Sequence, residues 1–390
     1  MEIKVGDLIQ KAKVSRCGDG DYPVLSMTMH EGLMFQNDRF KKQIASVDQS
    51  NYQVVKRHQL VESFPIDEGV LAVQELTDEG IVSPAYKIWD VNMDKVIPIY
   101  LELALRSPRS IEYYKSKLRG TTARRRSITD AEFCAMQINC PDLREQKRII
   151  ELITRAKAIA AKRQQELDTL DELIKARFVE MFGDPVENPK GYRVDNLQAL
   201  IDAGDITYHL DGNHGGDYPR SEEFVSEGVP YIGANCISNG EIDFSLAKYL
   251  TVERAGKLRK GIAQNEDVLF AHNATVGPTV VLHTTEPKVI LSTSLTAYRC
   301  NKESIMPEYL ATYMKSDGFV MQYSSEMKQT TRNQVPITAQ KKYLFLIPPM
   351  EEQKAFSEFV KQVDKSKVAV QKSLDETQKL FDSLMQEYFG

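Results

Sequence analysis

Residues 141–183 read PDLREQKRIIELITRAKAIAAKRQQELDTLDELIKARFVEMFG, and residues 348–390 read PPMEEQKAFSEFVKQVDKSKVAVQKSLDETQKLFDSLMQEYFG. Shifted by 207 positions, the two stretches align without a gap, and twelve of the forty-three positions are identical. The identical pairs include Gln146 with Gln353, Leu167 with Leu374, and the Phe-Gly dipeptide that closes each stretch. The chain therefore contains an internal repeat, and this repeat decides how it is divided.

Both stretches carry mostly apolar residues at a spacing of seven, the pattern of paired helices. Each could instead be an ordinary amphipathic helix lying on its own domain, but the ungapped repeat favours two stripes that bury each other. Arg163, Arg177 and Lys367 interrupt the seam with charge. We expect the two helices to pair through Ile149, Ile153, Leu167, Leu170, Ile174, Phe356, Val360, Val363, Val370, Leu374 and Phe381.

The 390 residues exceed a single typical core, so more than one domain is expected. We place a first domain at residues 1–140, a first spacer helix at 141–183, a second domain at 184–347 and a second spacer helix at 348–390. The domains also echo each other, since Pro98, Tyr100 and Leu101 recur as Pro307, Tyr309 and Leu310, and Pro23 recurs as Pro230. A second helix that buries its stripe on the first must run back along it.

The expected fold class is therefore α+β, with two mixed α/β domains joined by two long antiparallel coiled-coil helices in a pseudo-two-fold repeat. A helix of about forty residues is about 60 Å long. In the first domain, residues 97–118 have helical spacing with a break at Ser107-Pro108, and residues 133–140 are predicted as a strand.

The composition is that of an ordinary globular protein, with 42% hydrophobic and 27% charged residues. No run of eighteen apolar residues occurs, and residues 1–10 lack the basic flank and apolar core of a signal peptide, so we expect a cytoplasmic protein without membrane association. The five cysteines form no C-x-x-C pair, which fits free thiols in a reducing compartment.

Motifs that would carry chemistry are missing from the sequence. There is no G-x-x-x-x-G-K-[ST] phosphate loop, and Asn188-Pro189 continues as Lys-Gly, unlike the N-P-P-[YF] of an amino-methyltransferase. His209 and His214 could bind a metal, but a polar surface loop is the favoured interpretation. We therefore expect no catalytic residue, no metal and no cofactor bound by this chain.

Two polar loops at equivalent places in the domains are the candidate interface. The net charge of −5 does not indicate nucleic-acid binding, yet residues 106–126 contain eight Lys or Arg against one acid, Glu112. The first loop, GTTARRRS, spans 120–127, and the second, KQTTRNQV, spans 328–335. Arg can pair with guanine, and Asn and Gln with adenine, so the loops have the residues of a DNA-reading surface. A solvated charged turn is the alternative.

The candidate DNA-binding residues combine these loops with neighbouring strand and turn positions. They are Ser26, Thr28, Lys115, Lys117, Arg119, Thr121, Thr122, Arg124, Arg125, Arg126, Tyr231, Asn235, His272, Asn273, Lys328, Thr330, Thr331, Arg332, Asn333 and Gln334.

The sequence as a whole resembles the specificity subunits of type I restriction-modification systems. The resemblance covers essentially the whole chain and rests on the domain-helix repeat, the E-Q-K helix starts at Glu145 and Glu352, the LFDSLMQEYFG ending and strand motifs such as VPYIGAN. It departs from the family where Asn273 stands at a turn that usually carries glycine, although Gly277 is retained. Asn tolerates left-handed backbone, so we expect the turn to survive.

The resemblance implies a subunit without chemistry of its own that reads a bipartite, asymmetric DNA site with two target recognition domains. Two methylation subunits and the restriction subunits would be its partners, and S-adenosylmethionine, ATP and Mg would be bound by those partners. The sequence leaves two alternatives open. One is a self-contained DNA methyltransferase or nuclease, and the other is a coiled-coil scaffold that does not bind DNA.

Overall fold

The computed structural model describes residues 1–29, 31–39, 49–118, 127–327 and 333–390. They form two compact units. Unit 1 comprises Met1–Gln164 together with Gln371–Gly390, and unit 2 comprises Gln165–Val370. Each long helix therefore contributes one half to each unit, because α5 spans Leu143–Phe182 and α11 spans Met350–Phe389.

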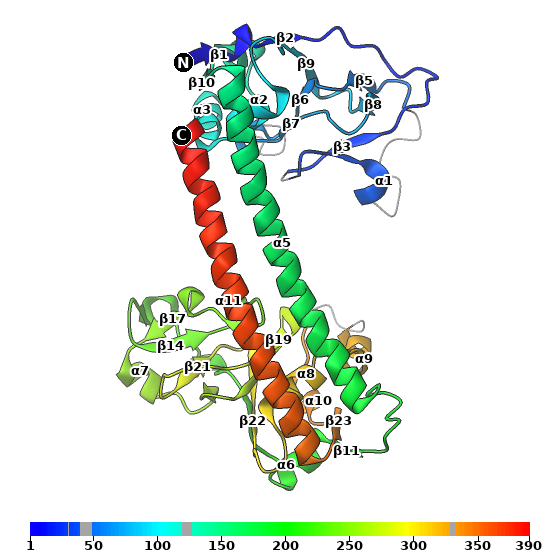
Figure 1. Cartoon of the computed structure of the whole chain (residues 1–390). Helices are drawn as coiled ribbons and strands as arrows, with labels where there is room; N and C mark the ends of the chain where they lie inside the picture. Colours follow the sequence, from blue (N-terminus) through cyan, green and yellow to red (C-terminus); the bar gives the residue numbers. More distant parts are fainter. Residues whose placement is uncertain (30, 40–48, 119–126, 328–332) are drawn as a thin grey trace. The chain divides into compact units, whose positions relative to one another are not determined.

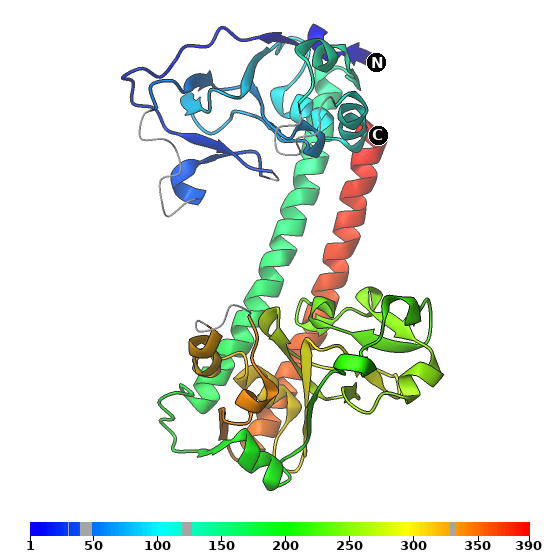
Figure 2. The same ribbon diagram turned by 180° about the vertical axis from the view of Figure 1, so that it is seen from behind.

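In both units the two long helices lie side by side and run in opposite directions (Figures 1 and 2). In unit 1, Ile149 and Ile153 near the start of α5 share a core with Met385 and Phe389 at the end of α11. In unit 2, the end of α5 shares a core with the start of α11, through Phe182 and Phe356 among others. The predicted fold class, α+β with two long antiparallel helices, is confirmed.

Every position of the predicted seven-residue seam is buried or half-buried, including the three charged interruptions. Lys367 is held there by Asp171 of the facing helix, with Nζ 2.5 Å from Oδ1. The sequence pattern missed the aromatic residues at the two helix ends, Phe178, Phe182 and Phe389, which are buried although they lie off the seam. They are buried because the helix ends pack on the domains as well as on each other.

Unit 1 is built on a four-stranded antiparallel sheet in the order β2-β9-β6-β7, beside three strand pairs, β1-β10, β3-β4 and β5-β8. Its strands are β1 (Glu2–Lys4), β2 (Ile9–Lys11), β3 (Leu25–Met27), β4 (Leu33–Phe35), β5 (Gln53–Lys56), β6 (Leu60–Glu62), β7 (Leu71–Val73), β8 (Glu79–Val82), β9 (Lys87–Val91) and β10 (Gln137–Asn139). Its short helices are α1 (Gln36–Arg39), α2 (Pro98–Leu105), α3 (Pro108–Lys117) and α4 (Asp130–Ala135).

Local capping explains where the helices of unit 1 begin. The predicted break at Ser107-Pro108 is confirmed, because the Ser107 side chain caps α3 by accepting a hydrogen bond from Ser110 N. The strand predicted over 133–140 is wrong at its start. Thr129 and Glu132 form a capping box that initiates α4, so only Gln137–Asn139 is a strand.

Unit 2 repeats the central sheet in the order β12-β22-β19-β20, again antiparallel throughout, and adds a five-stranded sheet, β13-β17-β14-β21-β18. Its strands are β11 (Arg193–Asn196), β12 (Ile206–Asp211), β13 (Phe224–Val225), β14 (Val229–Ile232), β15 (Ile237–Ser238), β16 (Glu241–Ile242), β17 (Lys248–Leu250), β18 (Ile262–Ala263), β19 (Val268–Asn273), β20 (Thr275–Val281), β21 (Val289–Leu291), β22 (Leu295–Cys300) and β23 (Leu344–Ile347). Its short helices are α6 (Leu197–Asp202), α7 (Val252–Gly256), α8 (Pro307–Tyr313), α9 (Asp317–Met327) and α10 (Ile337–Gln340).

The echo between Pro23 and Pro230 also has a structural basis. The residue after Pro23 forms a parallel bridge with Ile81, and the residue after Pro230 pairs in parallel with Ile290. The units therefore share a framework, and unit 2 carries additional strands on it. Among the described residues, no helix is long and apolar enough to span a lipid bilayer.

Candidate nucleic-acid interface

Half of the candidate DNA-binding residues fall outside the described ranges. These are Arg119, Thr121, Thr122, Arg124, Arg125, Arg126, Lys328, Thr330, Thr331 and Arg332. The described part of the candidate interface therefore consists of the segments that follow these residues, 127–130 in unit 1 and 333–335 in unit 2, and of the strands beside these segments.

In unit 2, the structure brings together two candidate pairs that are far apart in the sequence. Asn273, at the end of β19, forms an antiparallel bridge with Gln334. Two backbone hydrogen bonds flank the bridge, from Ala274 N to Asn333 O at 2.9 Å and from Val335 N to His272 O at 2.8 Å. The β19–β20 turn and the segment 333–335 thus form one polar surface, with Asn333 exposed and Asn273 and Gln334 half-buried.

The turn itself survives without glycine, as expected, but the residue that takes the left-handed conformation is Ala274, with φ of 65°. Asn273 is instead the last residue of β19. An alanine rarely adopts positive φ, and here the pairing of Asn273 with Thr275 and the hydrogen bond from Ala274 N to Asn333 O both stabilise the turn.

Three candidate residues lie with their side chains inside the protein. Thr28, Tyr231 and His272 are 7%, 6% and 1% exposed. The Thr28 hydroxyl donates to Gly32 O at 2.9 Å, and His272 Nδ1 lies 3.0 Å from Val335 O. We therefore correct their assignment. In this structure these side chains support the polypeptide and do not face solvent, where a base edge would be.

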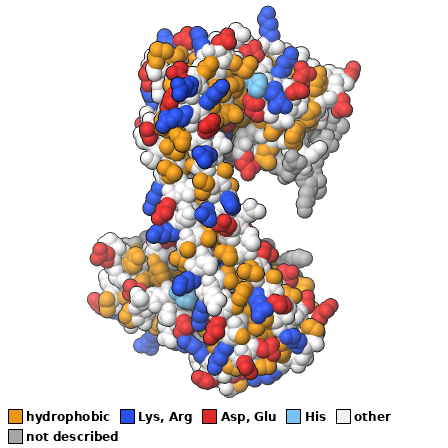
Figure 3. All heavy atoms as spheres, in the orientation of Figure 1, with side chains coloured by type: hydrophobic (Ala, Val, Ile, Leu, Met, Phe, Trp, Pro, Cys, Tyr) orange, Lys and Arg blue, Asp and Glu red, His pale blue; other side chains and the backbone are white. Residues whose placement is uncertain are grey.

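The other described candidates are more accessible. Lys115 and Lys117 are exposed in the last turn of α3, and the Lys117 ammonium lies 5.6 Å from the centre of the Tyr113 ring. Asn235 is exposed in the short turn after β14, and Ser26 is half-buried in β3. On the face shown in Figure 3, Lys and Arg side chains are interspersed with Asp and Glu in each unit.

A buried, uncharged network holds the segment 333–335 from below. Gln340, in α10, is fully buried, and its Oε1 accepts hydrogen bonds from Tyr298 OH at 2.6 Å and from His209 Nε2 at 3.1 Å. Its Nε2 donates to Thr296 Oγ1 at 3.1 Å and to Val335 O at 3.3 Å. We call Gln340, Tyr298, His209 and Thr296 the neutral anchor.

The histidines of this region are kept uncharged by burial. Burial lowers the pKa of His209 to about 4, against a smaller upward effect of its hydrogen bond to Gln340. Burial also lowers the pKa of His272. Because Val335 O can only accept, His272 Nδ1 must carry its hydrogen.

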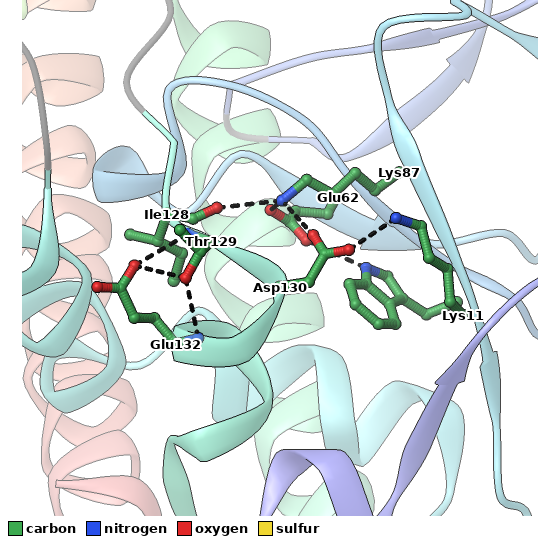
Figure 4. Close-up of polar contacts among 8 residues, drawn as sticks. Lys11, Glu62, Lys87, Ile128, Thr129, Asp130 and Glu132 are labelled. Atoms are coloured by element: carbon green, nitrogen blue, oxygen red, sulfur yellow. Dashed lines mark hydrogen bonds and ion pairs between the residues drawn. The ribbon is translucent and has the colours of Figure 1, made fainter.

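A charged network occupies the corresponding place in unit 1, where it holds the residues that follow the first loop (Figure 4). The Lys87 ammonium donates to Glu62 Oε1 at 2.9 Å and to Ile128 O at 3.1 Å, and it lies 2.9 Å from Asp130 Oδ1. The three donors of the lysine are therefore all used. Trp89 Nε1 donates to Glu62 Oε2 at 3.1 Å, and Lys11 Nζ lies 2.7 Å from Asp130 Oδ2. We call Glu62, Lys87, Trp89 and Asp130 the charged anchor.

Burial and ion pairing have opposite effects on the pKa values of the charged anchor. Burial raises the pKa of Glu62, which is 2% exposed, and outweighs the nearby Lys87. Burial disfavours the ammonium of Lys87, but attraction to Glu62 and hydrogen bonds to Glu62 and Asp130 outweigh it and raise the pKa of the lysine. The hydrogen bonds from Lys11 and Lys87 lower the pKa of Asp130 despite its burial. The anchor is therefore stable only as an assembled set of charges.

Strand registers align the two anchors position by position. Leu60 lies opposite Trp89, and Val268 lies opposite Tyr298, so Trp89 corresponds to Tyr298. By the same registers Lys87 corresponds to Thr296, and the buried Glu62 to Phe270. The framework is shared, whereas the chemistry that fixes the two segments is entirely different. Sequence reasoning missed these residues, although the offset of 209 positions that relates Pro98 to Pro307 also pairs Lys87 with Thr296.

The next feature of the described residues is the placement of their potential metal ligands. Within residues 1–29, 31–39, 49–118, 127–327 and 333–390, no group of three or more His, Cys, Asp or Glu side chains is arranged to hold a metal ion. His209 and His214 do not converge, because His209 contacts Gln340 whereas His214 Nε2 lies 2.7 Å from Asp211 Oδ2.

The two units share one framework, and the anchors beneath their polar segments differ. The chain is similar in sequence and in fold to one class of known proteins. The sequence model of the type I restriction modification DNA specificity domain matches residues 204–377. The type I restriction enzyme MjaVIII specificity subunit of Methanocaldococcus jannaschii is 20% identical over 272 residues, which cover 68% of this chain and 63% of that protein.

The putative type I restriction enzyme MjaX specificity subunit of the same organism is 22% identical over 284 residues, covering 70% of this chain and 63% of that protein. The chain thus spans about 63% of the length of these curated relatives.

Two solved structures share the fold over the whole chain. The type I restriction-modification S subunit from M. genitalium has a TM-score of 0.59 at 13% identity, covering 100% of this chain and 96% of that one. A chain from a structural study of complex assembly and conformational transition of the type I R-M system has a TM-score of 0.54 at 18% identity, covering 100% and 97%. Residues 204–377 of this chain thus match the type I restriction modification DNA specificity domain, and the chain as a whole is similar to type I restriction-modification specificity subunits.

Proposed function

We propose that this protein is the sequence-specific DNA-recognition subunit of a type I restriction-modification complex and reads a bipartite, asymmetric site. The observation that carries the proposal is the pairing of one framework with two different polar surfaces. Unit 1 presents a segment held by Lys87 after an arginine-rich loop, and unit 2 presents Asn333 and Gln334 against the β19–β20 turn. Different surfaces on equivalent frameworks favour unrelated half-sites.

Two methylation subunits, and restriction subunits with them, are the proposed partners of the chain. The helix repeat supports two equivalent docking positions, because several of its identical residues are exposed in both copies. Leu173 and Leu380 correspond in the repeat and are 45% and 54% exposed. An exposed leucine that recurs beside recurring polar residues such as Glu180 and Glu387 favours one kind of partner bound twice.

Adenine methylation and ATP-driven translocation with cleavage are assigned in this proposal to the partner subunits, with S-adenosylmethionine, ATP and Mg bound there. The chain itself is proposed to be non-catalytic and to act in the cytoplasm. The missing phosphate loop and amino-methyltransferase motif support this division.

The decisive experiment uses the chain co-purified with its methylation partner. Sequencing of methylated adenines in a host that carries the complete system should return one bipartite motif, and a footprint of the complex should protect that motif. A complex that protects no specific bipartite sequence would overturn the proposal.

Two further measurements separate the alternatives. Binding of S-adenosylmethionine by the isolated chain would favour a self-contained methyltransferase. Unchanged DNA affinity of a folded variant with Arg124, Arg125 and Arg126 replaced by alanine, together with a negative footprint, would favour a scaffold that does not bind DNA.

A further inference from the structure

The two anchors lie beneath the segments that follow the predicted DNA-reading loops, and each is confined to one unit. In unit 1 the segment begins at Ser127, directly after the arginine run, and it is fixed within a few residues by Lys87. In unit 2 the segment begins at Asn333 and is fixed by Gln340 and His272. Both anchors stand on the equivalent strands β9 and β22.

We propose that Lys87 and Gln340 are positioning residues for DNA recognition, each setting the fidelity of one half-site independently of the other. This inference rests on the proposed function and deepens it. Neither side chain is placed to contact DNA. Gln340 is fully buried, and the three N–H donors of the Lys87 ammonium are directed at protein groups. They act through the backbone that they hold.

The contacts explain why each residue controls the path of the backbone. Lys87 ties the carbonyl of Ile128 and the side chain of Asp130 to the buried Glu62, so a single ammonium links the segment to the central sheet. Asp130 is also the first residue of α4, whose capping box at Thr129 and Glu132 fixes the direction of the chain there (Figure 4). Removal of the ammonium would free this junction and leave Glu62 buried without its cation.

Gln340 performs the same task with neutral groups. Its amide nitrogen reaches Val335 O, which also accepts from His272 Nδ1, and Val335 itself is fully buried. Asn333 and Gln334 therefore lie two residues and one residue, respectively, before the fixed Val335. Reading a base edge requires placement within a fraction of an ångström, so loosening this point should relax discrimination more than affinity.

The test uses the chain in complex with its methylation partner and DNA duplexes that carry single-base substitutions in either half of the methylated motif. The variants are Lys87→Met and the milder Asp130→Asn for unit 1, and Gln340→Leu and the milder Thr296→Val for unit 2. The milder variants keep the test valid if a stronger one fails to fold. Lys95→Met, which removes an exposed lysine outside the anchor, is the charge control.

We expect the unit 1 variants to reduce discrimination between bases by about tenfold in one half-site, and the unit 2 variants to do so in the other. Lys87→Arg, which retains several hydrogen-bond donors, should keep most of the wild-type discrimination between bases. Lys95→Met should leave the discrimination in both half-sites unchanged. Equal changes in both half-sites, or unchanged profiles in folded variants, would overturn the inference. The footprint of the wild-type complex tests the proposed function separately. If the wild-type complex protects a bipartite motif but the variants discriminate between bases as well as the wild type, only the positioning role is refuted.

Discussion

The ring of Phe389, near the end of α11, lies 5.1 Å from the ring of Tyr100 in α2, measured between ring centres. Tyr100 in turn donates from its hydroxyl to Asn139 O at 3.0 Å. The arrangement recurs in unit 2, where Phe182 at the end of α5 lies 4.9 Å from Tyr309, whose hydroxyl donates to Leu346 O at 2.7 Å. The last turn of each long helix is thus fixed on the domain that the other long helix leaves.

These aromatic contacts should stabilise one unit each. Phe389→Ala should destabilise unit 1, and Phe182→Ala unit 2, by about 3–5 kcal/mol, because each removes a large buried ring from a packed core. Amide hydrogen exchange resolves the units, with loss of protection expected in β9 for the first variant and in β22 for the second. The exposed Leu380→Ala is the control, with a change of about 0.5 kcal/mol or less. Equal loss in both units from either variant would contradict the assignment.

The two glutamines that recur at the starts of α5 and α11 make matching hydrogen bonds. Gln146 Oε1 accepts from Ile97 N at 2.8 Å, and its Nε2 donates to Lys95 O at 3.0 Å and Pro141 O at 2.8 Å. Gln353 makes the matching bonds to Met306 N, Ser304 O and Pro348 O. Both side chains are fully buried.

Replacement of Gln146 or Gln353 by alanine should therefore cost on the order of 1–3 kcal/mol, since buried backbone groups lose their partners. Denaturant unfolding of each variant measures the loss. Lys147→Ala is a matched control, because Lys147 is also identical in the repeat but exposed. A cost for Lys147→Ala as large as that for Gln146→Ala would show that the position, and not its hydrogen bonds, matters.

Much of the fold could be predicted from the sequence, because the seven-residue spacing of apolar residues and the ungapped repeat can be recognised without knowing the tertiary structure. Residues 141–183 and 348–390 revealed the helices, and Ser107-Pro108 revealed a helix break. The anchors could not be read in this way, since Lys87, Glu62 and Asp130 come from three separate elements and meet only after the sheet has formed. The burial of His272 was hidden for the same reason, because the segment that covers it lies far along the chain.

Acid should destabilise unit 2 through its buried histidines. The pKa of His209 is lowered to about 4 in the folded protein, below its value of about 6.5 when unfolded, so the unfolded chain binds more protons between these values. Stability should therefore fall as the pH drops from about 6.5 towards 4, with a slope of up to about 1.4 kcal/mol per pH unit for His209. His272, whose pKa is also lowered, adds in the same direction.

Unfolding curves across this range check the expectation. His209→Gln, which can still donate to Gln340, should show a shallower decline than the wild type. The exposed His283→Gln controls for the loss of a histidine as such and should keep the wild-type slope. Parallel wild-type and His209→Gln curves would refute the role of His209.

The lysine in the seam of unit 2 should be dispensable for stability. Lys367 is 19% exposed and pairs with Asp171 and, at 3.4 Å, with Asp364, both of which are more exposed. Because removal of the ammonium leaves no buried charge behind, Lys367→Met should be neutral or stabilising by about 1 kcal/mol. Thermal unfolding of the variant measures this, and a loss of more than about 1 kcal/mol would mean that the ion pair is a net contributor.

The continuous helix α5 yields a prediction about the DNA target. A seven-residue insertion preserves the apolar seam and adds about 10.5 Å of helix, which corresponds to about three base pairs of DNA. Placed between Gln164 and Gln165 and also between Val370 and Gln371, it would fall at the boundaries of the two units and leave each unit intact.

If the helices set the gap between the half-sites, the methylated motif should keep both halves and gain about three base pairs between them. Sequencing of methylated adenines measures this directly. A two-residue insertion at the same points is the control, because at 3.6 residues per turn it rotates the apolar seam by about 200° and should abolish the motif. An unchanged gap after the seven-residue insertion would refute the helices as the ruler of the site.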